Sequence, residues 1–241
     1  MINSGDTAWV LASSALVLLM TPGLAFFYGG MTRAKSTLNM MMMSFASLGV
    51  VSVLWVLFGY QLAFGDSGSE WYGALSFSGL SDSVNSLVAN GAKYPIPVLA
   101  FAAFQLMFAV ITPALISGAF AERIKFTGSM VFMALWLVIV YLPMAHMVWG
   151  AGGLMGAVSG AIPAFDFAGG TVVHINAAVA GLVGAYMVGK RVGYGREAMA
   201  PHSLTLTMVG ASLLWVGWFG FNAGSNLEAN GTAALAFMNT V

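Results

Sequence analysis

The chain consists of long apolar segments that alternate with short polar connections. Apolar segments of helix length lie at about residues 9–31, 40–64, 96–121, 127–149, 168–189 and 203–223, and another begins near Gly231. A helix needs about 20 apolar residues to cross the hydrocarbon core of a bilayer. The pattern therefore predicts six complete transmembrane helices and the start of a seventh. The predicted fold class is all-α, a polytopic membrane helix bundle.

The composition supports a membrane protein and excludes several other classes. Hydrophobic residues make up 59% of the 241 residues and charged residues only 7%, whereas soluble domains carry about 25% charged residues. The formal net charge is zero, which gives no basic surface for nucleic acid. The absence of cysteine excludes disulfides and thiolate chemistry. The first residues carry Asp6 instead of the cationic start of a signal peptide, so we expect residue 1 to lie close to the mature start.

Positive charges gather in alternate connections. Seven of the eight lysines and arginines follow the first, third or fifth segment: Arg33, Lys35, Arg123, Lys125, Lys190, Arg191 and Arg196. The other connections carry the acids Asp66, Glu70, Asp82, Asp166 and Glu228, with Lys93 as their cation. Cytoplasmic loops of membrane proteins are enriched in lysine and arginine. The pattern predicts that the amino terminus lies outside the cell.

The longest connection, at about residues 65–95, is polar and rich in Ser, Gly and Asn. We expect it to be an exposed extracellular connection and not a second domain. The whole chain, residues 1–241, is therefore assigned to one transmembrane domain.

The fifth segment carries an acid and a histidine within apolar surroundings. It begins Asp166-Phe-Ala-Gly-Gly-Thr-Val-Val-His174 and ends at Lys190 and Arg191. Ionisable side chains inside membrane spans are rare and usually mark substrate or proton pathways. Two interpretations of Asp166 stay open: a cap on the first amides of the helix, or a fixed negative charge that attracts a cation to a nearby mouth.

His174 is predicted to face the interior of the bundle, because it shares a helix face with the small residues Ala177, Ala178 and Gly181. One interpretation is a core histidine that is hydrogen-bonded to a neighbouring helix. Within a membrane span we favour a functional role. A ring kept neutral by apolar surroundings has one donor and one acceptor nitrogen, which suits a small hydrogen-bonding solute or a proton relay.

No metal or other cofactor is predicted. His146 and His202 fall near opposite membrane faces in the predicted topology, so they give no zinc ligands beside His174. The chain also contains no P-loop, GxSxG, HExxH or dinucleotide-binding motif. We therefore expect no enzymatic activity.

Aromatic residues lie near the ends of two segments that are predicted to be extracellular: Trp149 in the fourth, and Trp218 with Phe221 in the sixth. They form either an ordinary aromatic belt at the membrane interface or a cation–π site for a small cation. In the first segment, Pro22-Gly23 and Tyr28-Gly29-Gly30 indicate a broken or closely packed helix.

These motifs resemble those of the ammonium transporter (Amt/MEP/Rh) family, on its Amt side. The segment Asp166–Arg191 resembles the family signature nearly end to end. Supporting matches are Met20-Thr-Pro-Gly-Leu-Ala-Phe-Phe-Tyr-Gly-Gly30, Gly118-Ala-Phe-Ala-Glu-Arg-Ile-Lys-Phe126, Ala145-His-Met-Val-Trp-Gly150 and Gly217-Trp-Phe-Gly-Phe-Asn-Ala-Gly-Ser225. The resemblance covers the whole chain.

The resemblance implies about eleven membrane helices in the intact protein, built as an inverted repeat of five plus five, and a homotrimer with one path per subunit. It implies that Trp149, Phe108 and Ser225 recruit ammonium, and that Phe108 and Phe221 form a phenyl gate below them. His174 matches the first of two lumen histidines that line the pore and relay protons. Asp166 and Trp218 match supporting residues.

The family also implies ammonium or its analogue methylammonium as substrate, the lipid bilayer of the cell membrane as location, and a PII-type signal protein as cytoplasmic partner. Its members carry a second lumen histidine and further helices beyond the part that matches these 241 residues. We therefore expect the chain to be the amino-terminal part of a transporter. An ammonium sensor is the main alternative function. A neutral-solute channel of the aquaporin type is disfavoured because no Asn-Pro-Ala motif occurs.

Overall fold

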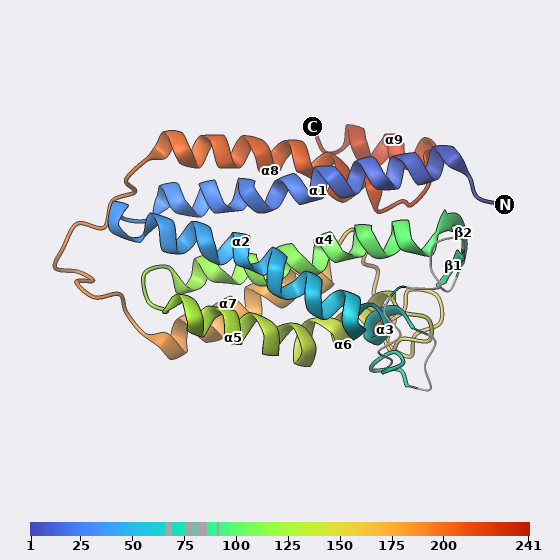
Figure 1. Ribbon diagram of the computed structural model, residues 1–241, viewed down its shortest axis with the longest axis horizontal. Helices are drawn as coiled ribbons and strands as arrows, with labels where there is room; N and C mark the ends of the chain where they lie inside the picture. The colour runs from blue at the N-terminus through green and yellow to red at the C-terminus, as the bar shows by residue number, and fades with distance from the viewer. Residues whose placement is uncertain (66–68, 76–79, 81–85, 91) are drawn as a thin grey trace.

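The computed structural model describes residues 1–65, 69–75, 80, 86–90 and 92–241. Long helices run side by side along the longest axis of the molecule (Figure 1). The helices, in chain order, are α1 (Ser4–Met31), η1 (Ala34–Ser36), α2 (Thr37–Leu54), η2 (Trp55–Gly59), α3 (Tyr60–Phe64), α4 (Val98–Ser117), η3 (Gly118–Phe120), α5 (Phe126–Trp136), η4 (Leu137–Tyr141), α6 (Leu142–Trp149), η5 (Gly170–Ile175), α7 (Asn176–Val188), α8 (Leu204–Gly224) and α9 (Gly231–Met238).

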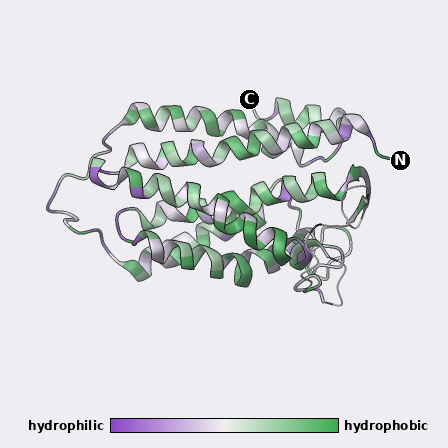
Figure 2. Ribbon diagram, viewed as in Figure 1, coloured by the Kyte–Doolittle hydropathy of each residue, from purple (hydrophilic) through white to green (hydrophobic). Residues whose placement is uncertain are grey.

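Six helical spans within the described residues are long and apolar enough to cross a membrane. They are Ser4–Met31, Ala34–Phe64, Val98–Phe120, Phe126–Trp149, Gly170–Val188 and Leu204–Gly224. Apolar residues predominate along all of these spans, while polar residues concentrate toward the ends (Figure 2). The predicted number and order of the spans are confirmed, and helix α9 is the predicted beginning of a seventh.

The first span begins earlier than the apolar pattern predicted. The side chain of Asn3 accepts hydrogen bonds from the amides of Gly5 and Asp6, at 2.9 and 3.2 Å. This cap starts the helix at Ser4 instead of at about residue 9, because a helix start needs acceptors for its free amides and not apolar side chains. The same helix continues through Pro22 to Met31 without a break.

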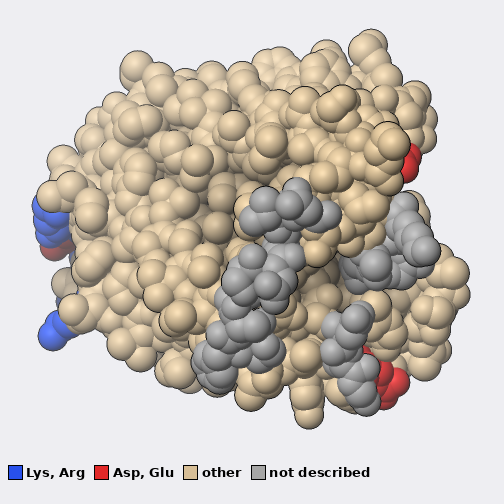
Figure 3. Space-filling model, turned by 45° about the vertical axis from the view of Figure 1, so that its right-hand side comes forward, with Lys and Arg blue, Asp and Glu red and all other residues tan. Residues whose placement is uncertain are grey.

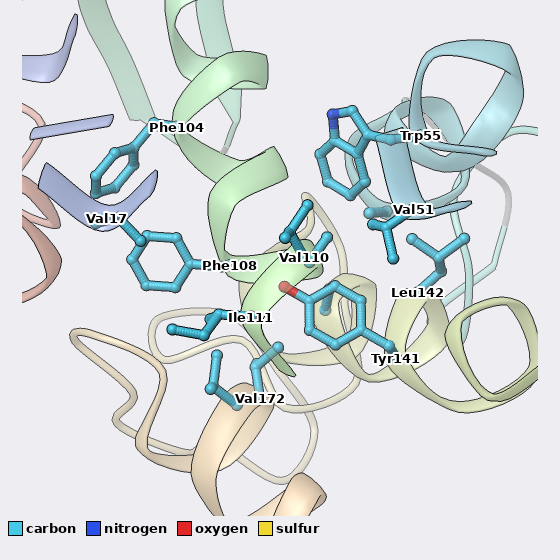
Figure 4. Close-up of a cluster of buried hydrophobic side chains, with 14 of the residues drawn as sticks. Val17, Val51, Trp55, Phe104, Phe108, Val110, Ile111, Tyr141, Leu142 and Val172 are labelled. Atoms are coloured by element: carbon cyan, nitrogen blue, oxygen red, sulfur yellow. The ribbon is translucent and has the colours of Figure 1, made fainter. Parts of the chain in front are cut away.

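The core is centred on α4, which packs against both α1 and α2 and also contacts α5 and α7. Figure 4 shows Phe108 on the side of α4 that faces Val17, while Val110 points toward Tyr141 on the opposite side. These four side chains are almost completely buried. Burial of an aromatic or aliphatic side chain removes its whole surface from the surroundings and packs it to the density of a crystal. Helix α4 therefore holds the buried aromatic residues in a fixed position.

Helices α1 and α8 pack closely through glycines. A methyl group at Gly23 would lie 3.0 Å from Cβ of Leu213, and one at Gly220 would lie 2.6 Å from Cβ of Leu16. Small residues let two backbones approach closely inside a membrane, where dispersion contacts drive helix association. Of the two interpretations of the glycine motifs in the first segment, close packing is therefore confirmed and a broken helix is wrong.

A short antiparallel hairpin was not predicted. Strand β1 (Leu87–Asn90) pairs with β2 (Ala92–Pro97), directly before α4. Val88 and Ile96 are buried, so part of this polar connection packs onto the bundle and is not simply exposed. Asp66 and Asp82, which contributed to the predicted topology, lie outside the described residues.

The two ends of the bundle differ in charge. We name them the amino-terminal end, which holds the start of α1, and the basic end, which holds the connections that follow α1, η3 and α7. Lysine and arginine gather at the basic end, where Glu122 and Glu197 lie among them, and among the described residues no lysine or arginine is seen at the opposite end of the face in Figure 3, where acidic residues lie. The structure thus places the seven alternate cations together, as the sequence pattern requires.

Candidate functional site

Three aromatic residues from three spans meet below the amino-terminal end. The ring of Phe108 in α4 lies 4.3 Å from the ring of Phe221 in α8, with 30° between the two planes. The ring of Trp149, the last residue of α6, meets Phe108 edge to face at 5.9 Å. Phe108 and Phe221 are each only 1% exposed. The two phenyl rings are therefore in contact with each other and buried in the interior of the bundle.

A cavity of about 290 Å³ lies on the amino-terminal side of these rings. Its lining residues include Tyr94, Phe101, Gln105, Phe108, Trp149 and Ser225. The structure thus brings together the three residues that the resemblance assigned to ammonium recruitment. It adds Tyr94, Phe101 and Gln105, which the sequence analysis did not select.

The hydrogen bonds around this cavity decide which groups remain for a ligand. The indole Nε1 of Trp149 donates to the backbone oxygen of Asp166 at 3.2 Å, which fixes the indole. The hydroxyl of Ser225 donates to the backbone oxygen of Phe221 at 2.8 Å. Because each group donates its hydrogen to the backbone, Trp149 offers a ring and Ser225 offers oxygen lone pairs to a ligand. This combination suits a small cation that donates hydrogen bonds.

Asp166 acts on the backbone and does not point a free carboxylate at the cavity. Its Oδ1 accepts from the amides of Gly169 and Gly170 at 2.6 and 3.0 Å, and its Oδ2 accepts from Thr171 and Val172 at 2.8 and 2.9 Å. These amides lie at the start of η5, so Asp166 is a helix cap. The helix begins at Gly170, four residues after Asp166. The carboxylate of Asp166 still lies at the wall of the cavity, although both of its oxygens are already hydrogen-bonded to backbone amides.

His174 lies on the other side of the phenyl pair. Its ring stacks on Trp218 at 5.5 Å with 5° between the planes, and lies 5.7 Å from Phe221. Trp218 was expected near a segment end, but it lies six residues inside the end of α8 and supports His174 there. The imidazole of His174 thus lies against two aromatic rings of α8, and one of them, Phe221, belongs to the phenyl pair.

A groove of about 470 Å³ continues from His174 toward the basic end. It is lined by His174, Tyr28, Leu115, Ile116, Ala119, Ala177, Ala178, Gly181, Leu182 and Ala185. The predicted small-residue face of α7 therefore borders this groove. Apolar walls of this kind do not solvate an ion, because a charge in such surroundings loses its hydration without compensation.

The other two histidines lie at opposite ends of the bundle, as predicted. His146 contacts the backbone oxygens of Ala63 and Ser69, at 2.9 and 3.1 Å, and His202 contacts that of Thr32 at 2.9 Å. Within the described part of the chain, no group of three His, Cys, Asp or Glu side chains is arranged to hold a metal ion.

The basic end is joined by a buried ion pair. Glu122 pairs with Arg33 at 2.5 Å, and its side chain is 2% exposed; Arg191 lies 4.0 Å away. Burial opposes ionisation of this carboxyl most strongly, but the hydrogen bonds and charge of Arg33, with the charge of Arg191, outweigh it and lower the pKa of Glu122. Arg33 also contacts Glu197 at 3.2 Å. These contacts hold three connections together.

The fold and these cavities define a polytopic α-helical membrane protein in which the pair of Phe108 and Phe221 contacts an aromatic cavity through Phe108 and contacts His174, at the head of an apolar groove, through Phe221. The sequence profile of the Ammonium Transporter Family matches residues 8–241. The chain is 49% identical to an ammonium transporter of Mycobacterium tuberculosis. The alignment is 259 positions long and covers 99% of this chain and 54% of that protein. The chain is 48% identical to an ammonium transporter of Bacillus subtilis, with 99% of this chain and 57% of the relative covered.

Solved structures agree with this result. Mep2 of Saccharomyces cerevisiae superposes with a TM-score of 0.84 at 34% identity, covering 98% of this chain and 53% of that one. A structure described as a sensor Amt protein superposes with a TM-score of 0.83 at 26% identity, covering 98% and 58%. The chain belongs to the ammonium transporter family, which is a family of transporters and not of enzymes. It spans about half the length of these relatives.

Proposed function

We propose that the protein that contains this chain conducts ammonium or ammonia across the cell membrane. The observation that carries the proposal is the order of three features along one path: a cavity with ring faces and oxygen acceptors, a closed phenyl pair, and His174 at the head of an apolar groove. Ammonium carries four N–H donors and one positive charge, which the cavity matches through Trp149, Phe108 and Ser225.

In this proposal ammonium loses a proton at or below the phenyl pair of Phe108 and Phe221. A neutral molecule can then pass the apolar groove, where a permanent cation such as sodium would have to leave its water without compensation. His174, with one donor and one acceptor nitrogen in its neutral form, gives the passing molecule a hydrogen-bond partner or relays the proton. Asp166 supports the cavity by fixing the start of η5, and Trp218 supports the ring of His174.

We also propose that the protein lies in the plasma membrane with its amino terminus outside, because lysine and arginine gather at the basic end. The family resemblance adds a homotrimer and a cytoplasmic PII-type signal protein, for which the basic end is the available face. Cross-linking in native membranes tests the trimer, and co-purification with a PII-type protein tests the partner.

The test of the main proposal is flux into proteoliposomes that hold the complete product of the reading frame containing these residues. Current is recorded after an ammonium jump and after a matched sodium jump, together with a pH-sensitive dye inside the vesicles. A saturable response to ammonium and none to sodium supports the proposal. Equal responses to both ions, or no response in either channel, contradict it.

An ammonium sensor is a second candidate, and the similarity to the structure described as a sensor Amt protein favours it. A sensor would bind ammonium in the same cavity without net flux. The intrinsic tryptophan fluorescence of the purified protein, titrated with ammonium, separates the two functions, because a sensor gives saturable quenching while both flux channels stay silent.

A further inference from the structure

Gln105 carries a buried polar atom that the fold itself does not use. The side-chain oxygen of Gln105 has no hydrogen-bond partner among the described residues, and the residue is only 9% exposed. Burial of an amide without a partner is unfavourable, and most buried polar groups in proteins are hydrogen-bonded. A methionine or leucine would fill the same space in α4 without this penalty. The glutamine therefore needs an explanation beyond packing.

The position of Gln105 supplies that explanation. It lies on α4 between Phe101 and Phe108, four residues after the first and three before the second, so the three side chains share one helix face. All three line the cavity of about 290 Å³, together with Trp149 and Ser225. Gln105, whose side-chain oxygen has no hydrogen-bond partner among the described residues, thus belongs to the wall of the cavity.

The hydrogen-bonding groups of the cavity determine which kind of ligand can provide a partner for the side-chain amide of Gln105. A half-turn of a glutamine amide brings either its oxygen or its NH₂ group toward a ligand without a change of shape. The hydroxyl of Ser225 already donates to Phe221, so a ligand there must donate. A ligand that only donates selects the amide oxygen. Ammonium is such a ligand, because all four of its hydrogens are donors and it has no acceptor.

We propose that Gln105 is a substrate-binding residue whose side-chain oxygen accepts a hydrogen bond from ammonium in the cavity beside Trp149 and Ser225. The inference rests on the proposed function and adds to it a directional acceptor. Gln105 and Ser225 accept N–H bonds while the rings of Phe108 and Trp149 face the charge.

The experiment measures uptake of labelled methylammonium by cells without their own ammonium transporters that express the complete product. Ammonium is the competitor, and its inhibition constant reports binding in the cavity. Gln105→Met keeps the volume but removes the acceptor. It is expected to raise the inhibition constant about tenfold, which corresponds to about 1.4 kcal/mol, and to change the maximal uptake rate less than the inhibition constant.

Two further variants separate substrate binding from a structural role. Gln105→Glu keeps acceptor oxygens at the same reach, and we expect an inhibition constant no higher than that of the unchanged protein. Gln61→Met makes the same change at a glutamine that does not line the cavity, and we expect no effect. An unchanged constant in Gln105→Met, or an equal rise in Gln105→Glu, would overturn the inference.

The outcomes also separate this inference from the proposed function. If the unchanged protein takes up no methylammonium, the proposed function fails and this inference fails with it. If uptake occurs and only the glutamine variants lack the expected effect, this inference alone fails. Should Gln105→Met not reach the membrane, Gln105→Asn decides, because its oxygen is withdrawn by one methylene: a raised constant supports the inference and an unchanged constant contradicts it.

Discussion

Replacement of Asp166 by asparagine distinguishes a helix cap from a charge that acts on a cation. The carboxylate accepts hydrogen bonds from four backbone amides, two at each oxygen. Asparagine keeps one oxygen and turns its NH₂ group toward the other two amides, which then lose their acceptor. Hydrogen bonds to charged groups contribute about 1.5–3 kcal/mol each. Because Asp166 is half-buried, we take the lower figure for each of the two lost bonds and expect a loss of about 3 kcal/mol.

The assay is the melting temperature of the purified protein in detergent, followed by tryptophan fluorescence. For domains of comparable size, each kcal/mol shifts the melting temperature by about 2–4 °C, so we expect Asp166→Asn to lower it by about 6–12 °C. Asp6→Asn is the matched control: Asp6 Oδ1 accepts from the amide of Ala229 at 2.8 Å, and an asparagine oxygen can keep this bond. An unchanged melting temperature in Asp166→Asn together with lost ammonium flux would refute the cap and assign the charge a direct role.

Three further predictions address the pore, the packing and the basic end. His174→Ala should lower the maximal ammonium flux by about 100-fold, the low end of what a positioned proton-transfer group contributes; flux equal to that of the unchanged protein would contradict a relay at this position. Gly210→Ala should destabilise the protein by about 1–3 kcal/mol, because the added methyl would overlap the backbone of α1. The control Gly49→Ala adds a methyl that meets no described residue within 4 Å, and it should be neutral or stabilising in the same melting assay. Because the pKa of Glu122 is lowered in the folded protein, ionised Glu122 stabilises the fold at pH values above the carboxyl's ordinary pKa of 4.5, and this stabilisation is lost as the pH falls below 4.5 toward the folded-state pKa. Between pH 5 and 3, the melting temperature of Glu122→Gln should therefore fall less steeply than that of the unchanged protein. Parallel curves for the two proteins would show that another group titrates.

The spans could be predicted from the sequence because a bilayer sets a simple physical requirement. A segment has to be long and apolar enough to cross, and both properties are local. The hairpin of β1 and β2 could not be predicted in this way. Its second strand contains both Pro95 and Pro97, which are typical of a turn or loop, and the strand pair is held by burial of Val88 and Ile96 against the bundle. Such tertiary packing leaves little trace in local composition.

The candidate site likewise contains residues that the local sequence indicates and one residue that it does not. Asp166 and His174 could be selected from the sequence because ionisable side chains inside apolar segments are rare, whereas the role of Trp149 was assigned from the family resemblance. Gln105 was passed over as part of an apolar helix, although its spacing to Phe108 places the two on one face. What makes Gln105 informative is that its side-chain oxygen has no partner in the part of the chain that the structure describes. This property depends on every neighbouring element and is therefore visible only in the assembled fold.

Helix α8 shows how a single sequence pattern both assembles the bundle and presents the site. Gly217, Gly220 and Gly224 face α1, where added methyl groups would overlap Met20, Leu16 and Ser13. Trp218, Phe221 and Ser225 each follow one of these glycines directly.

A step of one residue turns an α-helix by about 100°, since 3.6 residues complete a turn. Trp218, Phe221 and Ser225 therefore repeat the spacing of the three glycines on an adjacent face of α8. On this face Trp218 stacks on His174, Phe221 contacts Phe108, and Ser225 lines the cavity. The positions of these three side chains consequently depend on the close packing of α8 against α1. A larger residue at any of the three glycines would push the helix off α1 and carry the phenyl ring and the hydroxyl away from the path together.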